Sequence, residues 1–568
     1  MRSVRQADRR QSNRTDATDA NARGVRIKTF FSGVMALSLS TALVKVIGLF
    51  YKIPMLRYLT SVGMGYFNAA YEWYAMLSVL FTAGLPIAAS MLIAQQISRA
   101  EHDSEALDAV RRIERLSMRI FFWLGLLGSL ALYFGAGQIA RLIDSPMTVY
   151  ALKAVSPTVF FSCISASYRG YFQGFQNMIP TAVSQMIEAA GKLAFGVLFA
   201  RLAVASHMDV AYVAALAMLG LSLGVAISCA YLWGCRRKQA MTCNGGCADI
   251  ALSERQGLSL GKRLLAIAVP ITLSSFVLSI TKIVDMTMIL RRLQRIGYSV
   301  ERANSLYGIY TTMAVPIFNL VPALLTSVSL ALIPTLSSQI ADGDLLAQKS
   351  TVSTAMRLTA LLSLPASMAL AIYSRPVLGL LFHANAEELN MASPMLSLLS
   401  LSIVFSGLIT TTNAILQSYG YAHLPIYSML LGCLVKLISA YFLISSPSVQ
   451  MMGAPLSTLL CNALIVGLNL YLLYRKTQAL EHMGKILFQP LLISLISVGA
   501  PALAVAYLTH LGGNEWLLFL AAIPVTLFLM LIFSQMLGVI DVRLILRSGT
   551  TGKIPAHLGK SSFKLKKS

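Results

Sequence analysis

The sequence predicts an all-α membrane protein with about fourteen transmembrane helices, and its composition and hydropathy pattern carry that prediction. The chain has 568 residues, of which 56% are hydrophobic and only 12% are charged, and its mean hydropathy is +0.68. A soluble chain carries roughly 25% charged residues. Apolar runs of about 20 residues recur along the sequence, and each can cross a hydrocarbon layer of about 30 Å. Because lipid satisfies no backbone hydrogen bonds, these runs must be helices.

A hydropathy window of about 19 residues places the individual spans along the chain. Before them, residues 1–27 are polar and Arg-rich and lack a signal-peptide cleavage pattern, so we expect a cytoplasmic tail. After them, residues 537–568 are expected to form a second basic cytoplasmic tail. The expected spans are 28–55, 66–97, 116–137, 150–173, 178–201, 210–233, 262–290, 305–332, 352–374, 394–418, 422–445, 451–474, 486–509 and 515–536.

Two stretches of the sequence resemble each other and indicate an internal repeat. The stretch FQGFQNMIPTAVSQMIEAAGKL (172–193) aligns with LQSYGYAHLPIYSMLLGCLVKL (416–437), and weaker matches in the same order lie upstream. The lysines that correspond between the copies are Lys45 with Lys282 and Lys192 with Lys436.

The repeat predicts two pseudo-symmetric six-helix lobes of parallel topology, a layout that many secondary transporters share. We expect an N-terminal lobe at 28–233, a cytoplasmic linker at 234–261, a C-terminal lobe at 262–476 and two extra helices at 485–536. The linker contains Cys235, Cys243 and Cys247, but three thiols without a nearby His make a poor tetrahedral ligand set. We therefore expect no metal site and no cofactor.

The net charge of +23 follows the membrane topology rather than a nucleic-acid partner. If the N-terminus is cytoplasmic and the spans alternate, about two thirds of the 46 Lys and Arg residues fall on cytoplasmic segments. This asymmetry predicts that both termini are cytoplasmic, where the basic tails suit anionic lipid head groups. One loop on the predicted outside is an exception, and either the count of spans shifts there or the loop has a separate role. It contains Arg291, Arg292, Arg295 and Arg302.

Charged residues within the spans indicate a candidate binding site. A basic residue at the centre of a span costs about 2.5–3.5 kcal/mol on insertion scales, so each needs a reason. Lys45 and Lys52 are seven residues apart on one helix face, with Gly48 between them and no acid at helical spacing. We expect them to line a cavity. The other intramembrane charges are Lys153, Arg169, Lys192, Lys282, Lys436, Glu72, Glu188 and Asp285, with Arg57 close to a span end.

Some of these charges have a structural explanation. Arg57, Lys153 and Arg169 lie near span ends, where a basic side chain can reach the membrane surface. Acids and bases one helical turn apart can pair with each other. The pairs with this spacing are Glu188 with Lys192 and Lys282 with Asp285, and Glu72 is the expected partner of Lys45 or Lys52. The remaining excess is positive, which favours an anionic ligand such as a phosphate or diphosphate.

Several stretches together resemble the stage V sporulation protein B group of bacterial polysaccharide exporters. They are VKVIGLFYKIPMLRYL (44–59), GMGYFNAAYEWYAMLSVLFTAGLPIAAS (63–90), YRGYFQGFQNMIPTAVSQMIE (168–188) and LYGIYTTMAVPIFNLVPALLTSVSLALIPTLS (306–337). The resemblance covers nearly all of 28–536. That group is similar to the lipid II flippases of the multidrug/oligosaccharidyl-lipid/polysaccharide superfamily.

The resemblance implies a flippase of the bacterial cytoplasmic membrane that moves an undecaprenyl-diphosphate-linked saccharide by alternating access. It implies roles in polysaccharide or peptidoglycan synthesis, or in sporulation, with cell-wall synthesis machinery as a partner and no need for an oligomer. Basic residues of the first helix line a cationic cavity in similar flippases, and the last two helices form a groove for the lipid tail. The expected cavity residues here are Lys45, Lys52, Arg57, Arg169, Lys192, Lys282 and Lys436.

Two other functions are open from the sequence. A cation-coupled multidrug antiporter of the same superfamily would use the acids Glu72, Glu188 and Asp285, although twelve helices would suffice for it. A membrane glycosyltransferase needs a catalytic set on a sizeable loop, and the longest loop, 234–261, has none. We therefore do not expect an enzyme.

Overall fold

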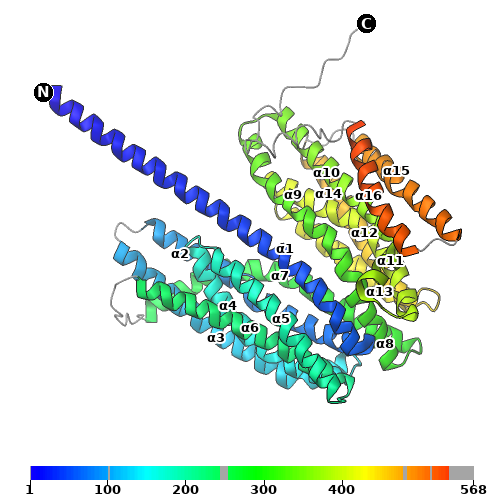
Figure 1. Cartoon of the computed structure of the whole chain (residues 1–568). Helices are drawn as coiled ribbons and strands as arrows, with labels where there is room; N and C mark the ends of the chain where they lie inside the picture. The colour runs from blue at the N-terminus through cyan, green and yellow to red at the C-terminus, as the bar shows by residue number, and fades with distance from the viewer. Residues whose placement is uncertain (1, 100–102, 243–253, 478–482, 512–514, 537–568) are drawn as a thin grey trace, which may run out of the picture. The chain divides into compact units, whose positions relative to one another are not determined.

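The computed structural model describes residues 2–99, 103–242, 254–477, 483–511 and 515–536. Over these residues the backbone forms sixteen α-helices, one π-helical turn and one 3-10 turn, without a strand (Figure 1). This confirms the predicted all-α fold. The predicted tail at 537–568 and residues 243–253 of the predicted linker lie outside the described residues.

Eleven helical stretches among the described residues are long and apolar enough to cross a membrane, which confirms a polytopic membrane protein. Fourteen spans are predicted, three more than these stretches. The first stretch, Leu43–Ile97, joins two predicted spans. Helices α5 (Ile179–Ala205) and α7 (Glu254–Arg295) coincide with predicted spans but are not among the eleven. In α5 the charged residues Glu188, Lys192 and Arg201 interrupt the apolar run.

The chain divides into two compact units. Unit 1 comprises Met1–Leu290 and Val300–Gly308, and unit 2 comprises Arg291–Ser299 and Ile309–Ser568. The boundary lies after α7 rather than in the predicted linker at 234–261. The predicted repeat concerns the order of the helices along the chain, whereas the two units are defined by contacts between residues. The two six-helix lobes therefore stay a prediction.

Helix α7 is part of unit 1, and it makes a close approach to the turn just before α2 (Leu85–Arg99). Gly84 lies so close to the backbone of Ala268 and the side chain of Thr272 that no Cβ would fit between them. A glycine at this turn therefore allows α7 to approach the other helices of unit 1.

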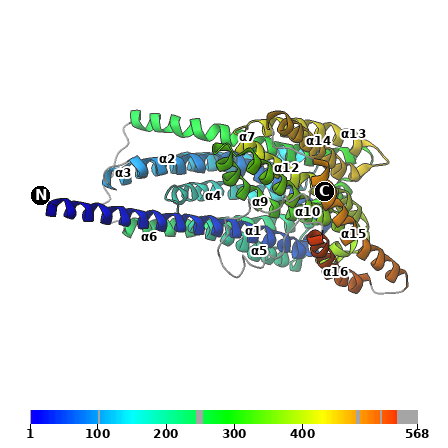
Figure 2. The ribbon, with the colours of Figure 1, turned by 90° about the horizontal axis from the view of Figure 1, so that it is seen from above.

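The other helices of unit 1 are mostly long, and several of them run side by side (Figures 1 and 2). Close pairs are α3 with α4, α4 with α6, and α5 with α6. The helices are α1 (Arg2–Thr82), α3 (Asp103–Leu142), α4 (Thr148–Gly174), α6 (Val210–Thr242) and, for most of its length, α8 (Val300–Ile309).

Helix α1 is bent at Thr60, where φ is 59° and ψ is 175°. A positive φ is rare and strained for a β-branched residue, so surrounding contacts must hold this bend. Residues on both sides of the bend meet in unit 1, because the rings of Tyr51 and Phe67 lie 6.0 Å apart. The helix begins at Arg2, so the backbone of residues 2–27 of the predicted tail is helical.

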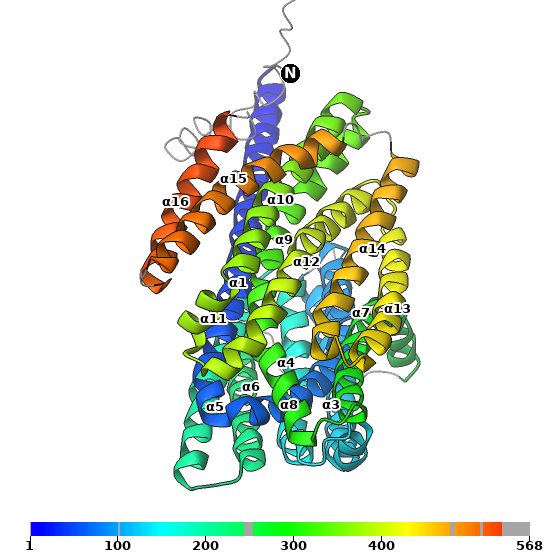
Figure 3. The same cartoon turned by 90° about the vertical axis from the view of Figure 1, so that its right-hand side faces the viewer.

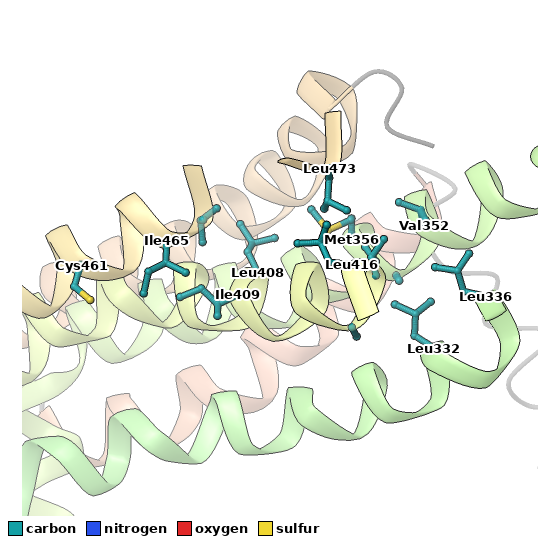
Figure 4. Close-up of a cluster of buried hydrophobic side chains, with 14 residues drawn as sticks. Leu332, Leu336, Val352, Met356, Leu408, Ile409, Leu416, Cys461, Ile465 and Leu473 are labelled. Atoms are coloured by element: carbon teal, nitrogen blue, oxygen red, sulfur yellow. The ribbon is translucent and has the colours of Figure 1, made fainter. Parts of the chain in front are cut away.

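Unit 2 is built around a buried apolar cluster contributed by four helices (Figure 4). Leu332 and Leu336 come from α9, and Val352 and Met356 from α10. The helices of unit 2 are α9 (Val315–Ala341), α10 (Leu345–Ile372), α11 (Ser374–Phe382), α12 (Ala386–Ser418), α13 (Leu424–Ser445), α14 (Gly453–Lys476), α15 (Met483–His510) and α16 (Glu515–Met536).

The last two helices, α15 and α16, lie side by side within unit 2 (Figure 3). They coincide with the two extra helices predicted at 485–536. Helix α16 contacts α11, where Gly379 leaves room for the ring of Trp516, and the ring of Phe519 lies 5.3 Å from that of Tyr373. Only 17% of the apolar window of α16 is buried, so most of its surface is available to lipid.

Candidate functional site

Unit 1 contains a pocket of about 420 Å³ between α1, α4, α5 and α6. Its wall combines cationic side chains, one carboxylate and three tyrosines. The lining residues are Thr41, Val44, Lys45, Ile47, Gly48, Tyr51, Tyr71, Tyr74, Arg169, Gln185, Glu188, Ala189, Lys192 and Leu221. The structure therefore brings together four of the charged residues that the sequence singles out.

Lys45 lines the pocket from α1 and has an exposed side chain. No carboxylate of the described residues lies within ion-pair distance of it. A Cβ added to Gly48, one turn along the helix, would meet open space, so this wall is not filled by a neighbouring helix. Lys45 is thus placed to contact a ligand.

Lys52 is half-buried and is not among the lining residues, although its spacing from Lys45 predicted a shared cavity. Two helical turns separate them by about 10 Å along the axis, and in the part of α1 before the bend at Thr60 the lining ends at Tyr51. Lys52 interacts electrostatically with Lys192 and Glu72. It therefore lies behind the pocket, and its pairing with Glu72 stays a prediction.

Arg169 and Glu188 form an ion pair in the pocket wall, with Nη2 of Arg169 2.8 Å from Oε2 of Glu188. Arg169 Nε also donates a hydrogen bond of 3.0 Å to Oγ of Ser184. Their side chains are 20% and 29% exposed. The prediction that Arg169 reaches the membrane surface is wrong, because a carboxylate and a hydroxyl hold its guanidinium inside the unit.

Lys192 lies on aromatic faces rather than in an ion pair with Glu188. Its Nζ is 4.4 Å from the ring centroid of Tyr71, 4.9 Å from that of Tyr51 and 6.0 Å from that of Phe67. Such cation–π contacts attract an ammonium by about 2 kcal/mol when they are desolvated. The predicted pairing of Glu188 with Lys192 is wrong because Arg169, on another helix, takes the carboxylate.

The tyrosines are the site residues that the sequence analysis missed. Tyr51 directly precedes Lys52. Tyr71 and Tyr74 lie on either side of Glu72 in the sequence and are three residues, about one helical turn, apart. Tyr74 is buried, and its hydroxyl lies 2.9 Å from Oγ of Ser162. The available signal in the sequence was the presence of tyrosines within apolar spans, because a buried tyrosine hydroxyl usually needs a hydrogen-bond partner. An aromatic residue in a hydrophobic run is, however, usually interpreted as a packing residue.

The remaining predicted residues lie outside the pocket. Arg57 is exposed on α1, and Lys282 is exposed on α7 with no ion pair to Asp285 among the described residues. Lys153 is exposed and its Nζ lies 5.6 Å from the ring of Tyr133. Lys436 belongs to unit 2 and is half-buried.

The side chains of the pocket leave it with an excess of positive charge. Lys45, Arg169 and Lys192 are cationic and Glu188 is anionic, so the lining carries a formal charge of +2. Where the structure describes the chain, no group of three or more His, Cys, Asp or Glu could hold a metal ion. The arrangement therefore favours a multiply charged anion.

The family described as "Polysaccharide biosynthesis protein" matches residues 30–339, which is more than half of the chain. The chain belongs to this family. A second family, described as "MatE", matches residues 311–442. The pocket of unit 1 thus lies within the part of the chain that matches the polysaccharide biosynthesis family.

Relatives from Bacillus subtilis (strain 168) align over most of this polysaccharide biosynthesis family member. "Uncharacterized membrane protein YabM" is 28% identical over 85% of this chain and 86% of its own length. "Stage V sporulation protein B" is 26% identical over 76% and 80%, and "Lipid II flippase MurJ" is 23% identical over 83% and 87%. These matches agree with the resemblance found in the sequence.

The fold is that of a solved flippase structure. "Lipid II flippase MurJ, inward closed conformation" superposes with a TM-score of 0.66 at 16% identity, over 89% of this chain and 98% of that chain. The family member therefore has the fold of this polytopic membrane protein.

Proposed function

We propose that this protein is a flippase that moves an undecaprenyl-diphosphate-linked saccharide across the bacterial cytoplasmic membrane. The observation that carries the proposal is the pocket of charge +2 among the apolar helices of unit 1. Positive charge inside a membrane protein is costly and is retained for function. A diphosphate that joins a lipid to a sugar supplies two negative charges to such a pocket.

The chemistry of the wall suits a diphosphate. Arg169 presents a planar guanidinium, of which Nε and Nη2 are engaged by Ser184 and Glu188, so Nη1 is left for a phosphate oxygen. Lys45 and Lys192 add two ammonium groups. We propose that Lys52, Arg57, Lys282 and Lys436 act outside this pocket, along the route of the head group.

The lipid tail needs an apolar surface. Most of α16 is not buried in the protein, and α15 has exposed apolar side chains such as Leu503 and Tyr507. We propose that α15 and α16 guide the tail while the head group crosses by alternating access. The membrane potential, worth about 2.3 kcal/mol per charge per 100 mV, can drive the step.

The proposal is tested by lipid II flipping in liposomes that contain the purified protein. Lys45→Ala is the sharpest variant, because Lys45 is exposed and takes part in no ion pair among the described residues, so its loss should not unfold the protein. We expect flipping to fall at least tenfold, since a charge-assisted contact contributes about 1.5–3 kcal/mol.

Lys153→Ala is the matched control, because Lys153 is also an exposed lysine in a helix of unit 1 but does not line the pocket. It should flip lipid II at the rate of the unmodified protein. Equal rates for all three proteins would rule out the pocket as the diphosphate site. No flipping by the folded unmodified protein would exclude lipid II as the substrate.

A cation-coupled multidrug antiporter is the second candidate, and the match of residues 311–442 to the MatE family favours it. Such a transporter needs an acidic site for organic cations. In the pocket of unit 1, however, Glu188 is already paired with Arg169 and two lysines add further positive charge. Binding of cationic dyes that is reversed by Na⁺ or H⁺ would favour this function over the flippase.

A further inference from the structure

Glu188 is the one acidic residue among the described residues that line the pocket, and it lowers the charge of that lining. Three cations and this carboxylate give +2, and the pocket would carry +3 without it. Lys52 and Glu72 do not line the pocket and are not part of this sum. Glu188 therefore lowers the charge of the lining by one unit.

Lipid-linked diphosphates differ in charge according to whether a sugar is attached. A diphosphate diester keeps one ionised oxygen on each phosphorus and carries a charge of −2. A terminal diphosphate has one more ionisable oxygen, and such a second ionisation has a pKa near 6, so its charge approaches −3 at neutral pH. A lining of +2 thus neutralises the sugar-bearing lipid and leaves the bare lipid diphosphate with an uncompensated charge.

We propose that Glu188 makes the pocket selective for a diphosphate diester over a terminal diphosphate, so that the sugar-bearing lipid is taken and the bare carrier is refused. This inference rests on the proposed function, because it assumes that the diphosphate occupies this pocket. An uncompensated charge is costly in a membrane protein, which makes one unit of net charge a strong basis for discrimination.

The position of Glu188 is fixed by a chain of contacts. Its Oε2 lies 2.8 Å from Nη2 of Arg169, whose Nε donates to Oγ of Ser184 at 3.0 Å. Ser184 is buried, its Oγ donates to the carbonyl of Thr181 at 2.7 Å, and its own carbonyl accepts from Oγ of Ser228 at 2.8 Å. The carboxylate is therefore a built part of the wall rather than a solvated surface charge.

The test compares two ligands on protein in lipid nanodiscs, namely undecaprenyl diphosphate and the same lipid carrying one N-acetylglucosamine. The measured quantity is the ratio of the two dissociation constants, because sugar contacts affect every variant alike. Glu188→Gln should shift this ratio about tenfold toward the bare diphosphate at pH 7.5. Glu188→Asp keeps the charge and should keep the ratio.

The matched control is Glu388→Gln, which removes the same charge from the first turn of α12 in unit 2 and should leave the ratio unchanged. A ratio that is the same in folded Glu188→Gln and the unmodified protein would overturn the inference and leave the flippase function standing. If the unmodified protein binds neither lipid, the proposed function itself fails.

A second measurement needs no variant and covers the case in which Glu188→Gln does not fold. Between pH 8 and pH 5.5 the terminal diphosphate loses its third charge while the diester keeps both of its own. The unmodified protein should therefore lose most of its preference for the diester as the pH falls. A preference that does not change with pH would contradict charge selection.

Discussion

At the scale of single residues, Lys192 combines a cost to stability with a role in binding. Its ammonium lies 4.4 Å from the ring centroid of Tyr71 and is half-buried. Burying a cation costs more than its contacts return in many proteins. Lys192→Met keeps the length of the side chain and makes favourable sulfur–aromatic contacts instead.

We predict that Lys192→Met has a melting temperature equal to or above that of the unmodified protein, whereas its flipping rate falls at least tenfold because a diphosphate contact is lost. Thermal unfolding in detergent and flipping in liposomes measure the two effects. Lys153→Met, in which the lysine is exposed, should change neither quantity. A drop in both quantities for Lys192→Met would mean that the lysine holds the structure together rather than binding the ligand.

The sequence identified the charges of the site but not their partners. Spacing along one helix suggested Glu188 with Lys192, whereas the structure pairs Glu188 with Arg169 from α4. Contacts between helices depend on how the helices are rotated against one another, and no periodicity within a single helix contains that information. For the same reason the spacing did not identify the tyrosines around Lys192.

At the scale of helices, the site depends on how closely α5 approaches α6. A Cβ on Gly224 of α6 would lie 2.8 Å from the backbone N of Lys192 and 2.9 Å from the carbonyl C of Gly191. These neighbours are backbone atoms, which cannot move aside cheaply. This close crossing of α5 and α6 thus lies directly behind Glu188 and Lys192. Small residues permit the close approach, as they do at many membrane helix interfaces.

We predict that Gly224→Ala destabilises the protein by about 1–3 kcal/mol through overpacking and lowers the flipping rate by displacing α5. Gly234→Ala is the control on the same helix, since a Cβ there meets nothing within 4 Å. It should be neutral or slightly stabilising, because alanine favours a helix over glycine by up to about 1 kcal/mol. Equal melting temperatures for the two variants would show that α5 and α6 are not tightly packed.

At the scale of the whole molecule, hydropathy predicted the fold class because a lipid bilayer allows few backbone structures. Hydropathy is less informative for a helix that carries several charged residues. Helix α5 carries Glu188, Lys192 and Arg201 and is not among the eleven apolar stretches. Its 27 residues nevertheless extend about 40 Å, which is enough to cross the hydrocarbon layer. The predicted topology requires that it does cross, since otherwise every later segment would change sides.

We predict that α5 spans the membrane with its C-terminal end outside. In a cysteine-free background, Ser206→Cys after α5 should react with a membrane-impermeant maleimide added to intact cells, whereas Asn177→Cys before α5 should react only after the cells are opened. Both side chains are exposed, so a difference in labelling reports the side of the membrane rather than burial. Labelling of both positions from the same side would place α5 along the membrane surface, and the pocket that it lines with Glu188 and Lys192 could then not carry a head group across.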